Sequence, residues 1–366
     1  MTISTHDLHE ILQLQKNAFN QHSFPSEKLR ITQLKALKVA LLKHQDKLIK
    51  AISADFGHRS EDETKLADIM PTILSIDYHI KHLRNWMKPE KRHVSVLFKP
   101  ASSSIMYQPL GVIGIMAPWN YPIFLTLGPL VAAIAAGNRA MIKPSEFTPY
   151  SNRILGDILQ DAFSKDEVAM VEGEADIAAA FSALPFDHLI FTGSTSVGKH
   201  VMTAAAQNLT PVTLELGGKS PALIAEDVQA DFAVERLLYG KCINAGQTCV
   251  APDYILCPES KLDDLVESLK KGFNNLYPDL SCGDYSSVIN DRQFSRLNAL
   301  IEDAREKGAT IVSLAESNAT QPRCLPLQVI LNPNDTMQVM QDEIFGPLLP
   351  ILTYKNIDDA ISLIKS

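Results

Sequence analysis

A lone cysteine in a loop of small residues is the first candidate for chemistry in this sequence. Cys249 ends the run Asn244-Ala-Gly-Gln-Thr-Cys249, whose composition is typical of a loop. A thiol there can act as a nucleophile once it ionises. The alternative is a buried structural cysteine, the usual role of a free cysteine, which suits Cys242 and Cys257 in predicted regular elements. Both interpretations of Cys249 stay open at this point.

A carboxylate upstream is a candidate base for the same chemistry. Glu215 lies between two leucines, just before Gly217-Gly218, at the end of a predicted strand. Apolar neighbours exclude water from a carboxylate, which suits a general base. A cap or a salt-bridge partner is the alternative. Together, Cys249 and Glu215 predict covalent catalysis at a thiol, with a separate carboxylate that activates water.

Other polar side chains follow predicted strands. Asn120, in Pro118-Trp-Asn-Tyr-Pro122, is either a turn residue or an amide donor directed at a developing oxyanion. Lys143 and Glu146, in Lys-Pro-Ser-Glu, either form a solvated loop or offer an ammonium and a carboxylate to ribose hydroxyls.

A glycine-containing segment opens a predicted helix. Phe191–His200 reads Phe-Thr-Gly-Ser-Thr-Ser-Val-Gly-Lys-His, and its backbone N–H groups could meet a phosphate. The segment does not match GxGxxG. It nearly matches the P-loop GxxxxGK[ST], but His200 stands where a hydroxyl should bind Mg²⁺. A P-loop NTPase and a ligand-free turn therefore stay open as alternatives.

One alternating pattern positions these candidates. From Gly111 onward, buried strands alternate with helices, which implies parallel sheets with ligands at the carboxyl ends of the strands. Asn120, Lys143, Gly193 and Glu215 each follow such a strand. The predicted strands are 112–116, 140–143, 168–171, 188–192, 212–216, 222–225 and 254–257, and the predicted helices are 123–136, 149–163, 177–184, 197–207 and 231–242.

The part before Gly111 is predicted to be helical, over residues 6–21, 26–57 and 61–87, with a break at Pro71. A projecting hairpin is expected at about 93–109. The uncharged stretch Gly111–Gly137 carries three prolines, so it predicts a strand, a turn and a buried helix instead of a membrane span. We expect a first domain over 1–215 and a second over 216–366.

The composition excludes several classes of protein. The net charge is −8, from 34 Lys and Arg against 42 Asp and Glu, so no basic excess exists to bind nucleic acid. Five cysteines without CxxC spacing argue against a disulfide framework, a zinc site or an iron–sulfur cluster, and favour the cytoplasm. The polar start indicates no signal peptide, and we expect no membrane partner. No GxSxG indicates a serine hydrolase, and no signature places a histidine for a Cys–His protease.

Six segments in order resemble the aldehyde dehydrogenase superfamily, and the resemblance covers nearly the whole chain. Within it the chain is most similar to the class 3 branch, through residues 209–215 and 249–256. In finer detail it is similar to bacterial coniferyl aldehyde dehydrogenases, through residues 52–60 and 183–188. The six segments are Pro118-Trp-Asn120, Lys143-Pro-Ser-Glu146, Phe191-Thr-Gly-Ser-Thr195, Leu214-Glu-Leu-Gly-Gly-Lys-Ser-Pro221, Gly246-Gln-Thr-Cys249 and Glu343-Ile-Phe-Gly-Pro347.

The resemblance implies a fold and a reaction. The fold has two Rossmann-type domains with parallel sheets and an oligomerisation hairpin. In the reaction, the Cys249 thiolate attacks an aldehyde, aromatic or otherwise bulky, while Asn120 and the Cys249 backbone N–H stabilise the oxyanion. Hydride then passes to the nicotinamide and leaves a thioester, which Glu215 hydrolyses through an activated water.

The resemblance also implies a cofactor site. Lys143 and Glu146 would bind the adenosine ribose, Ser194 the pyrophosphate, and Glu343 the nicotinamide ribose near Phe345. Glu146 would repel a 2′-phosphate, which favours NAD over NADP, although class 3 relatives tolerate both. The further residues expected to bind the cofactor are Trp119, Gly193, Thr195, Gly198 and Leu216.

The end of the chain differs from the family pattern. Family members continue well beyond the Glu343 motif, with part of the substrate entrance and a strand used in dimers. The ending at Ser366 is therefore interpreted as a truncation. We expect a homodimer for the complete protein, and an inactive truncated fragment is the non-enzymatic alternative.

Overall fold

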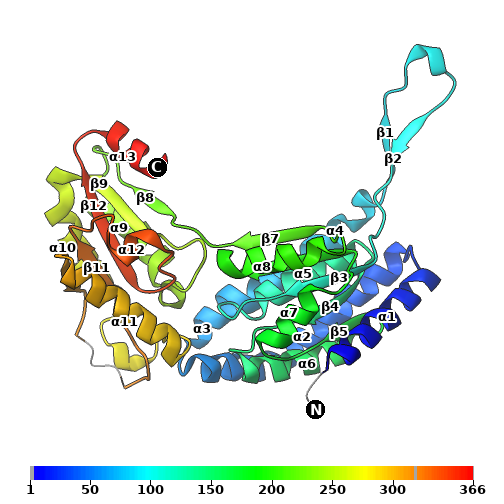
Figure 1. The fold of residues 1–366 in the computed structure, drawn as a ribbon, viewed down its shortest axis with the longest axis horizontal. Coiled ribbons are helices and arrows are strands. Elements are labelled where there is room, and N and C mark those ends of the chain that lie inside the picture. Colours follow the sequence, from blue (N-terminus) through cyan, green and yellow to red (C-terminus); the bar gives the residue numbers. More distant parts are fainter. Residues whose placement is uncertain (1–3, 317–319, 366) are drawn as a thin grey trace. The chain divides into compact units, whose positions relative to one another are not determined.

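The chain forms two compact units in the computed structural model, which describes residues 4–316 and 320–365 (Figure 1). The first unit comprises Met1–Ala51 and Thr64–Glu215, and the second comprises Ile52–Glu63 and Leu216–Ser366. The sequence-based division assigned residues 52–63 to the first domain. In the structure this short segment packs with the second unit, through hydrogen bonds described below.

A five-stranded sheet forms the centre of the first unit, in the order β5-β4-β3-β6-β7. Its central strand β3 is buried along its whole length and pairs in parallel with β4 and β6. Met116 lies opposite Lys143 on one side and Phe191 on the other, so the carboxyl ends of these three strands are level. The strands are β3 (Val112–Met116), β4 (Arg139–Lys143), β5 (Val168–Met170), β6 (His188–Gly193) and β7 (Val212–Leu216).

Helices cover this sheet. Helix α1 begins with a capping box between Ser4 and Asp7 and packs on β3 and β4, as α5 also does. The uncharged stretch from Gly111 folds as predicted into a strand, a turn and the short helix α5. No helix in the described ranges is long and apolar enough to cross a membrane. The helices are α1 (Thr5–Gln21), α2 (Glu27–Phe56), α5 (Phe124–Ala135), α6 (Pro149–Ala162), α7 (Ala175–Ser182) and α8 (Thr195–Ala206).

The helix predicted over 61–87 is divided into three parts. These are α3 (Glu61–Thr64), the π-helical turn η1 (Lys65–Ile69) and α4 (Met70–Trp86). Pro71 lies in the first turn of α4, so its missing N–H falls where the π turn η1 passes into the α-helix. The irregularity therefore precedes the proline, because the π turn extends the helix up to it.

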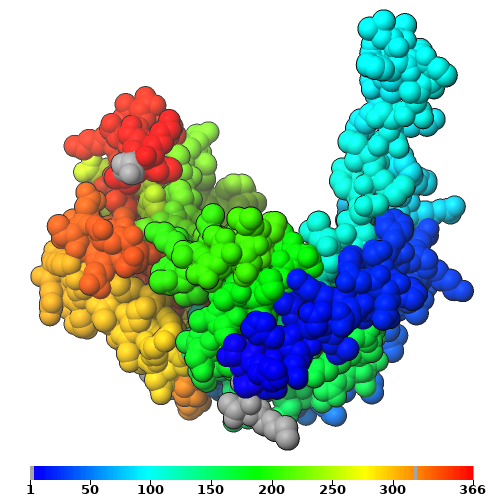
Figure 2. Space-filling model, turned by 45° about the vertical axis from the view of Figure 1, so that its right-hand side comes forward, coloured from blue at the N-terminus to red at the C-terminus, as the bar shows by residue number. Residues whose placement is uncertain are grey.

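A thin hairpin projects from the first unit (Figure 2). Strand β1 (Glu90–Arg92) pairs antiparallel with β2 (Ser103–Ile105), so the paired strands begin earlier than the predicted range of 93–109. The apolar run that suggested a strand instead forms the turn η2 (Val96–Phe98) at the tip. Its three side chains are exposed, because the tip has no sheet to pack against.

The second unit is built on a second five-stranded sheet, in the order β10-β11-β12-β9-β8. All neighbours are parallel except the edge pair β10–β11. Together the two mostly parallel sheets confirm the predicted α/β class. The strands are β8 (Pro221–Leu223), β9 (Tyr254–Pro258), β10 (Thr310–Ser313), β11 (Gln328–Leu331) and β12 (Leu348–Tyr354).

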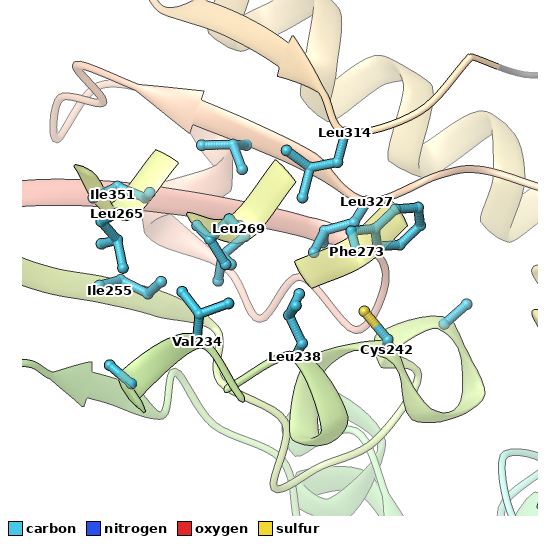
Figure 3. Packing of buried hydrophobic residues seen from close by; sticks show 14 of the residues in the cluster. Val234, Leu238, Cys242, Ile255, Leu265, Leu269, Phe273, Leu314, Leu327 and Ile351 are labelled. Atoms are coloured by element: carbon cyan, nitrogen blue, oxygen red, sulfur yellow. The ribbon is translucent and has the colours of Figure 1, made fainter. Parts of the chain in front are cut away.

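An apolar core fixes the helices of the second unit on their sheet. Leu238 and Cys242 of α9 pack with Leu269 and Phe273 of α10 and with Leu327 before β11 (Figure 3). Burial of such side chains contributes about 2 kcal/mol each. The helical elements are α9 (Ala230–Cys242), η3 (Ile243–Gly246), η4 (Glu259–Lys261), α10 (Leu262–Leu276), η5 (Leu280–Cys282), α11 (Asp291–Glu306), α12 (Gln338–Gln341) and α13 (Ile357–Lys365).

Candidate active site

The end of β4 carries a predicted pair of charges. The Lys143 side chain is buried, with only 4% of its surface exposed, and its Nζ lies 2.9 Å from Glu146 Oε2. The Ala117 N–H donates to the Lys143 carbonyl at 3.1 Å, which ties the residue after β3 to the end of β4. The structure therefore brings Lys143 and Glu146 together at the carboxyl edge of the sheet.

Asn120 lies in the turn between β3 and α5 and is 2% exposed. Its neighbour Trp119 is half-buried. A buried carboxylate at the start of α5 holds the turn, since Asp68 Oδ1 accepts the N–H groups of Ile123 at 3.1 Å and Phe124 at 2.9 Å. Asp68 belongs to the π turn η1. No motif in the sequence marks Asp68, because its partners lie more than fifty residues away.

The turn between β6 and α8 is very short. Strand β6 ends at Gly193 and α8 begins at Thr195, with Ser194 as the N-cap, whose Oγ accepts the Val197 N–H at 3.4 Å. A Cβ at Gly193 would approach the Phe191 ring to 2.5 Å. Gly198 is buried within α8. The P-loop alternative is therefore wrong, because its second glycine would lie inside the helix and not in a phosphate-binding loop.

The environment of Glu215 differs from the expectation. Glu215 lies on β7, the edge strand of the first sheet, and its side chain is exposed. Its neighbours Leu214 and Leu216 are only half-buried. The predicted exclusion of water by these leucines is not seen, because an edge strand has no neighbour on its outer side. Glu215 closes the first unit, whereas Cys249 belongs to the second.

Glu343 lies against the glycine pair that follows β7. Its carboxylate accepts a hydrogen bond from the Gly218 backbone, and burial raises the pKa of Glu343. A Cβ at Gly217 would lie 1.9 Å from Glu343 Oε2, so any larger residue there would displace the Glu343 carboxylate. The next aromatic residue, Phe345, has a left-handed φ of 47°, and its carbonyl accepts a hydrogen bond from Arg296.

A buried ion pair joins the two motifs around Glu343. Asp253 is 3% exposed, accepts the Ile344 N–H at 2.9 Å, and forms an ion pair with Lys219. Lys219 Nζ also donates to the carbonyl of Val339 at 2.9 Å. These contacts fix the Glu343 segment against the Gly217–Lys219 segment. Lys219 and Asp253 both lie in segments that resemble the family, but only the folded structure shows that they form an ion pair.

Cys249 follows an unusual backbone. Asn244, Ala245 and Gly246 have consecutive left-handed φ values of 51°, 50° and 71°. A Cβ at Gly246 would meet the Gly346 carbonyl oxygen at 2.5 Å. The loop therefore packs tightly against the segment that carries Phe345, and the Cys249 side chain is half-buried. The loop predicted around this thiol is confirmed.

The other four cysteines are poor nucleophiles. Burial raises the pKa of Cys242 to about 12 and that of Cys257 to about 11. Burial also raises the pKa of Cys324, while a hydrogen bond to Asp279 raises that of Cys282. A neutral thiol is much less reactive than a thiolate. By elimination, Cys249 is the candidate with the most suitable surroundings.

Comparisons with known proteins decide the family. The sequence model of the aldehyde dehydrogenase family matches residues 2–365. The chain belongs to the aldehyde dehydrogenase family. It is 52% identical over 352 residues to a protein of Pseudomonas aeruginosa described as a probable coniferyl aldehyde dehydrogenase, covering 96% of this chain and 74% of that protein.

Solved structures of aldehyde dehydrogenases share the fold. A substrate-bound structure of Staphylococcus aureus AldH matches with a TM-score of 0.93 and 37% identity, over 100% of this chain and 78% of that one. A Mycobacterium tuberculosis aldehyde dehydrogenase complexed with NAD⁺ matches with a TM-score of 0.88 and 27% identity, over 99% and 76%. The predicted superfamily and its class 3-like branch of coniferyl aldehyde dehydrogenases are thereby confirmed as this chain's relatives.

Proposed function

We propose that the chain oxidises an aromatic or other bulky aldehyde, such as coniferyl aldehyde, to the carboxylic acid with NAD. The observation that carries this proposal is the loop that holds Cys249, a half-buried thiol on a left-handed backbone, whereas the pKa values of Cys242, Cys257, Cys282 and Cys324 are raised. The high identity to a probable coniferyl aldehyde dehydrogenase supports the choice of substrate.

The chemistry begins at Cys249. Its thiolate forms a bond to the carbonyl carbon, the π electrons move to the oxygen, and the Asn120 amide donates a hydrogen bond to the resulting oxyanion. NAD, when bound, accepts the hydride that leaves this carbon. The thioester at Cys249 is then hydrolysed. Glu215 takes a proton from water, the hydroxyl attacks the carbonyl, and the thiolate leaves.

The first unit offers suitable groups for NAD. Asn120, Lys143 and Ser194 follow the level ends of β3, β4 and β6, which is where open α/β sheets bind ligands. Ser194 caps a twelve-residue helix whose N-terminus favours a phosphate, and Gly193 allows close approach. Lys143 and Glu146 would hold the adenosine ribose. Trp119, Thr195, Gly198 and Leu216 stay predicted as further contacts.

The second unit offers further groups for the cofactor. Glu343, held on the Gly218 N–H, would bind the nicotinamide ribose beside Phe345. The Glu146 carboxylate would repel a 2′-phosphate and so favour NAD over NADP. In Glu146→Gln this repulsion is absent, so we expect the ratio of kcat/KM for NAD over that for NADP to fall.

The decisive experiment combines turnover with mass spectrometry. Coniferyl aldehyde, benzaldehyde and an aliphatic aldehyde are tested with NAD and with NADP. We expect NADH formation, and an acyl group on Cys249 after rapid quenching. Cys249→Ala should reduce kcat at least about 10³-fold, because no covalent route then remains. Activity that survives this substitution would exclude the proposed mechanism.

We also propose a cytoplasmic homodimer. Cysteines that form no disulfide bond among the described residues suit that compartment. The exposed hairpin of the first unit, with Val96, Leu97 and Phe98 at its tip, offers apolar surface for a second copy. Sedimentation of the purified protein tests this assembly, and a monomer at all concentrations would exclude it.

A further inference from the structure

We infer that Gln247 is a positioning residue for Cys249, and that a chain of contacts from Phe56–Glu63 holds Gln247 in place. The inference rests on the proposed role of Cys249 as the nucleophile. It concerns contacts within the second unit alone. None of the residues in this chain of contacts belongs to the groups assigned above to substrate or cofactor.

The Gln247 side chain is fully buried and makes three hydrogen bonds. Its Nε2 donates to the Asn244 carbonyl at 2.9 Å and to the Ser287 carbonyl at 3.1 Å, and its Oε1 accepts the Ile289 N–H at 3.0 Å. One amide thus binds the start of the Cys249 loop to a segment about forty residues further along the chain. Cys249 is only two residues from this anchor.

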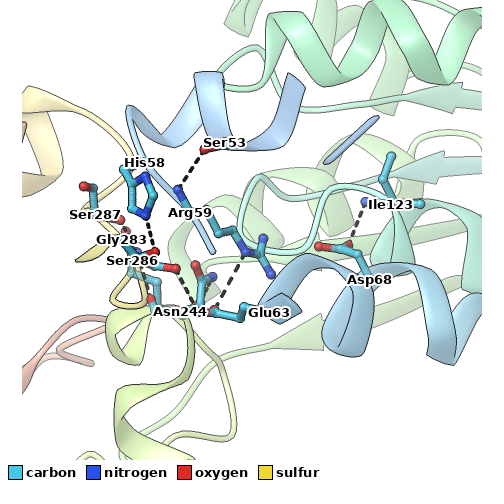
Figure 4. A network of polar contacts seen from close by, with 11 residues as sticks. Ser53, His58, Arg59, Glu63, Asp68, Ile123, Asn244, Gly283, Ser286 and Ser287 are labelled. Atoms are coloured by element: carbon cyan, nitrogen blue, oxygen red, sulfur yellow. Dashed lines mark hydrogen bonds and ion pairs between the residues drawn. The ribbon is translucent and has the colours of Figure 1, made fainter. Parts of the chain in front are cut away.

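The segment that receives Gln247 is itself held by residues 56–63 (Figure 4). The Ser287 N–H donates to the His58 carbonyl at 2.9 Å, and Ser286 Oγ donates to Glu63 Oε2 at 2.8 Å. His58 also bonds through its ring Nε2 to the Gly283 carbonyl. Residues 283–289 therefore have fixed neighbours on both sides, Gln247 on one and residues 58–63 on the other.

Two arginines reinforce this contact. Arg59 is 1% exposed, and its Nε lies 3.7 Å from Glu63 Oε1. Arg323 donates from Nη2 to the Phe56 carbonyl at 2.9 Å and from Nε to the Val288 carbonyl at 2.8 Å. Buried charged donors are costly to leave unmatched, so these residues favour one arrangement of the segment.

The Gln247 contacts determine where the loop places the Cys249 thiol. The left-handed stretch Asn244–Gly246 is an intrinsically strained backbone, which persists only where tertiary contacts enforce it. Gln247 supplies those contacts with a neutral amide and adds no charge beside the thiol. Loss of the amide would let the loop relax, and a displacement of about 1 Å can cost a hundredfold in rate.

The first test compares two buried glutamines. Gln247→Met keeps the volume and removes all three hydrogen bonds. Gln328→Met is the matched control, because Gln328 is also buried in the second unit and donates to Ser313 and Pro326, away from the loop. We expect kcat to fall on the order of tenfold to a hundredfold in Gln247→Met, with KM within about twofold, and to change little in Gln328→Met.

The rate of alkylation of Cys249 by iodoacetamide, measured across pH, separates positioning from general destabilisation. We expect a changed pH profile for Gln247→Met and an unchanged one for Gln328→Met, because only the first alters the surroundings of the thiol. Equal effects of both substitutions on kcat and on the profile would overturn the inference. If Cys249→Ala keeps full activity, the proposed function fails instead, which is a distinguishable result.

A second pair of variants tests the contact between Ser286 and Glu63, and it keeps the inference testable if Gln247→Met does not fold. Ser286→Ala removes the hydroxyl bound to Glu63. Ser287→Ala is the neighbouring control, because its buried hydroxyl has no hydrogen-bond partner in the described chain and its backbone carbonyl is kept. We expect kcat to fall about threefold to tenfold in Ser286→Ala and to stay unchanged in Ser287→Ala. Equal kcat in both serine variants would contradict this part of the inference.

Discussion

The Asn120 turn and the Cys249 loop are held in place by different kinds of contact. The turn follows a fully buried strand, and a buried carboxylate, Asp68, caps the helix that begins after it. The loop follows a helix and has three left-handed residues, held by the neutral amide of Gln247. Regular elements and a charge determine the first conformation, whereas strain and the uncharged amide of Gln247 determine the second.

This difference suits the two proposed tasks. An oxyanion donor needs only a rigid amide, and a charged cap on the N–H groups three and four residues beyond Asn120 supplies rigidity. A thiolate is sensitive to nearby charge, and a carboxylate in the position of Gln247 would oppose its formation. A neutral amide fixes the loop without that cost.

The largest effect is expected from Gly246→Ala. The added Cβ would face the Gly346 carbonyl at 2.5 Å, on a residue with a φ of 71°, so the loop must move. We expect the free energy of unfolding to fall by about 3 kcal/mol. Trp86 and Trp119, the only two tryptophans, both lie in the first unit. The transition followed by far-UV circular dichroism should therefore shift more than that followed by tryptophan fluorescence.

Gly240→Ala is the control for this prediction. Gly240 lies inside α9, and a Cβ there would meet Pro252 at an ordinary 3.5 Å. Alanine in a helix interior should raise stability by up to about 1 kcal/mol. If both variants unfold like the unmodified protein, the strain assigned to the Cys249 loop is absent.

A smaller effect is expected from Asp68→Ala, in the other region. It leaves the buried N–H groups of Ile123 and Phe124 without their acceptor, which costs about 2 kcal/mol. We expect kcat to fall because Asn120 moves, while alkylation of Cys249 keeps its rate. Asp68→Asn retains an acceptor oxygen and should lose about half as much stability. A changed alkylation rate in Asp68→Ala would show that the two regions are not independent.

The sequence predicted the Asn120 turn better than the Cys249 loop. Alternating strands and helices placed Asn120, Lys143 and Ser194 at strand ends because local periodicity determines those elements. Gln247 was visible in the motif, but its partners Ser287 and Ile289 lie forty or more residues away and have no motif of their own. Contacts of that range are made by the fold and cannot be inferred from spacing.

The expected surroundings of Glu215 were wrong for a related reason. Two flanking leucines suggested a buried base, but adjacent residues on a strand point to opposite faces, and β7 is an edge strand. Strand order decides whether such a residue is covered, and strand order is a property of the whole sheet. Similarly, residues 52–63 span the end of one predicted helix and the start of the next, yet Glu63 binds Ser286 and the segment joins the second unit.

The smallest step, about 1 kcal/mol per pH unit, is expected from Lys241→Met, which tests whether ionisable groups near the Cys249 loop are as costly as the comparison implies. Lys241 lies in the last turn of α9, is 1% exposed, and burial lowers its pKa from 10.5 to about 8. The folded protein therefore releases this proton at a lower pH than the unfolded chain. Between about pH 8 and 10.5 the unfolded chain holds one more proton than the folded protein, so the free energy of unfolding rises with pH in that window. The same stability is lost again as the pH falls from 10.5 to 8.

Removal of Lys241 should abolish this contribution. The free energy of unfolding of the unmodified protein, minus that of Lys241→Met, should increase by about 1 kcal/mol per pH unit from pH 8 upward. Urea unfolding at several pH values measures this difference. A difference that stays flat across the window would mean that Lys241 is charged at little cost, and hence that the surroundings of the Cys249 loop tolerate charge. The neutrality of Gln247 would then no longer explain why an amide, and not a carboxylate, holds that loop.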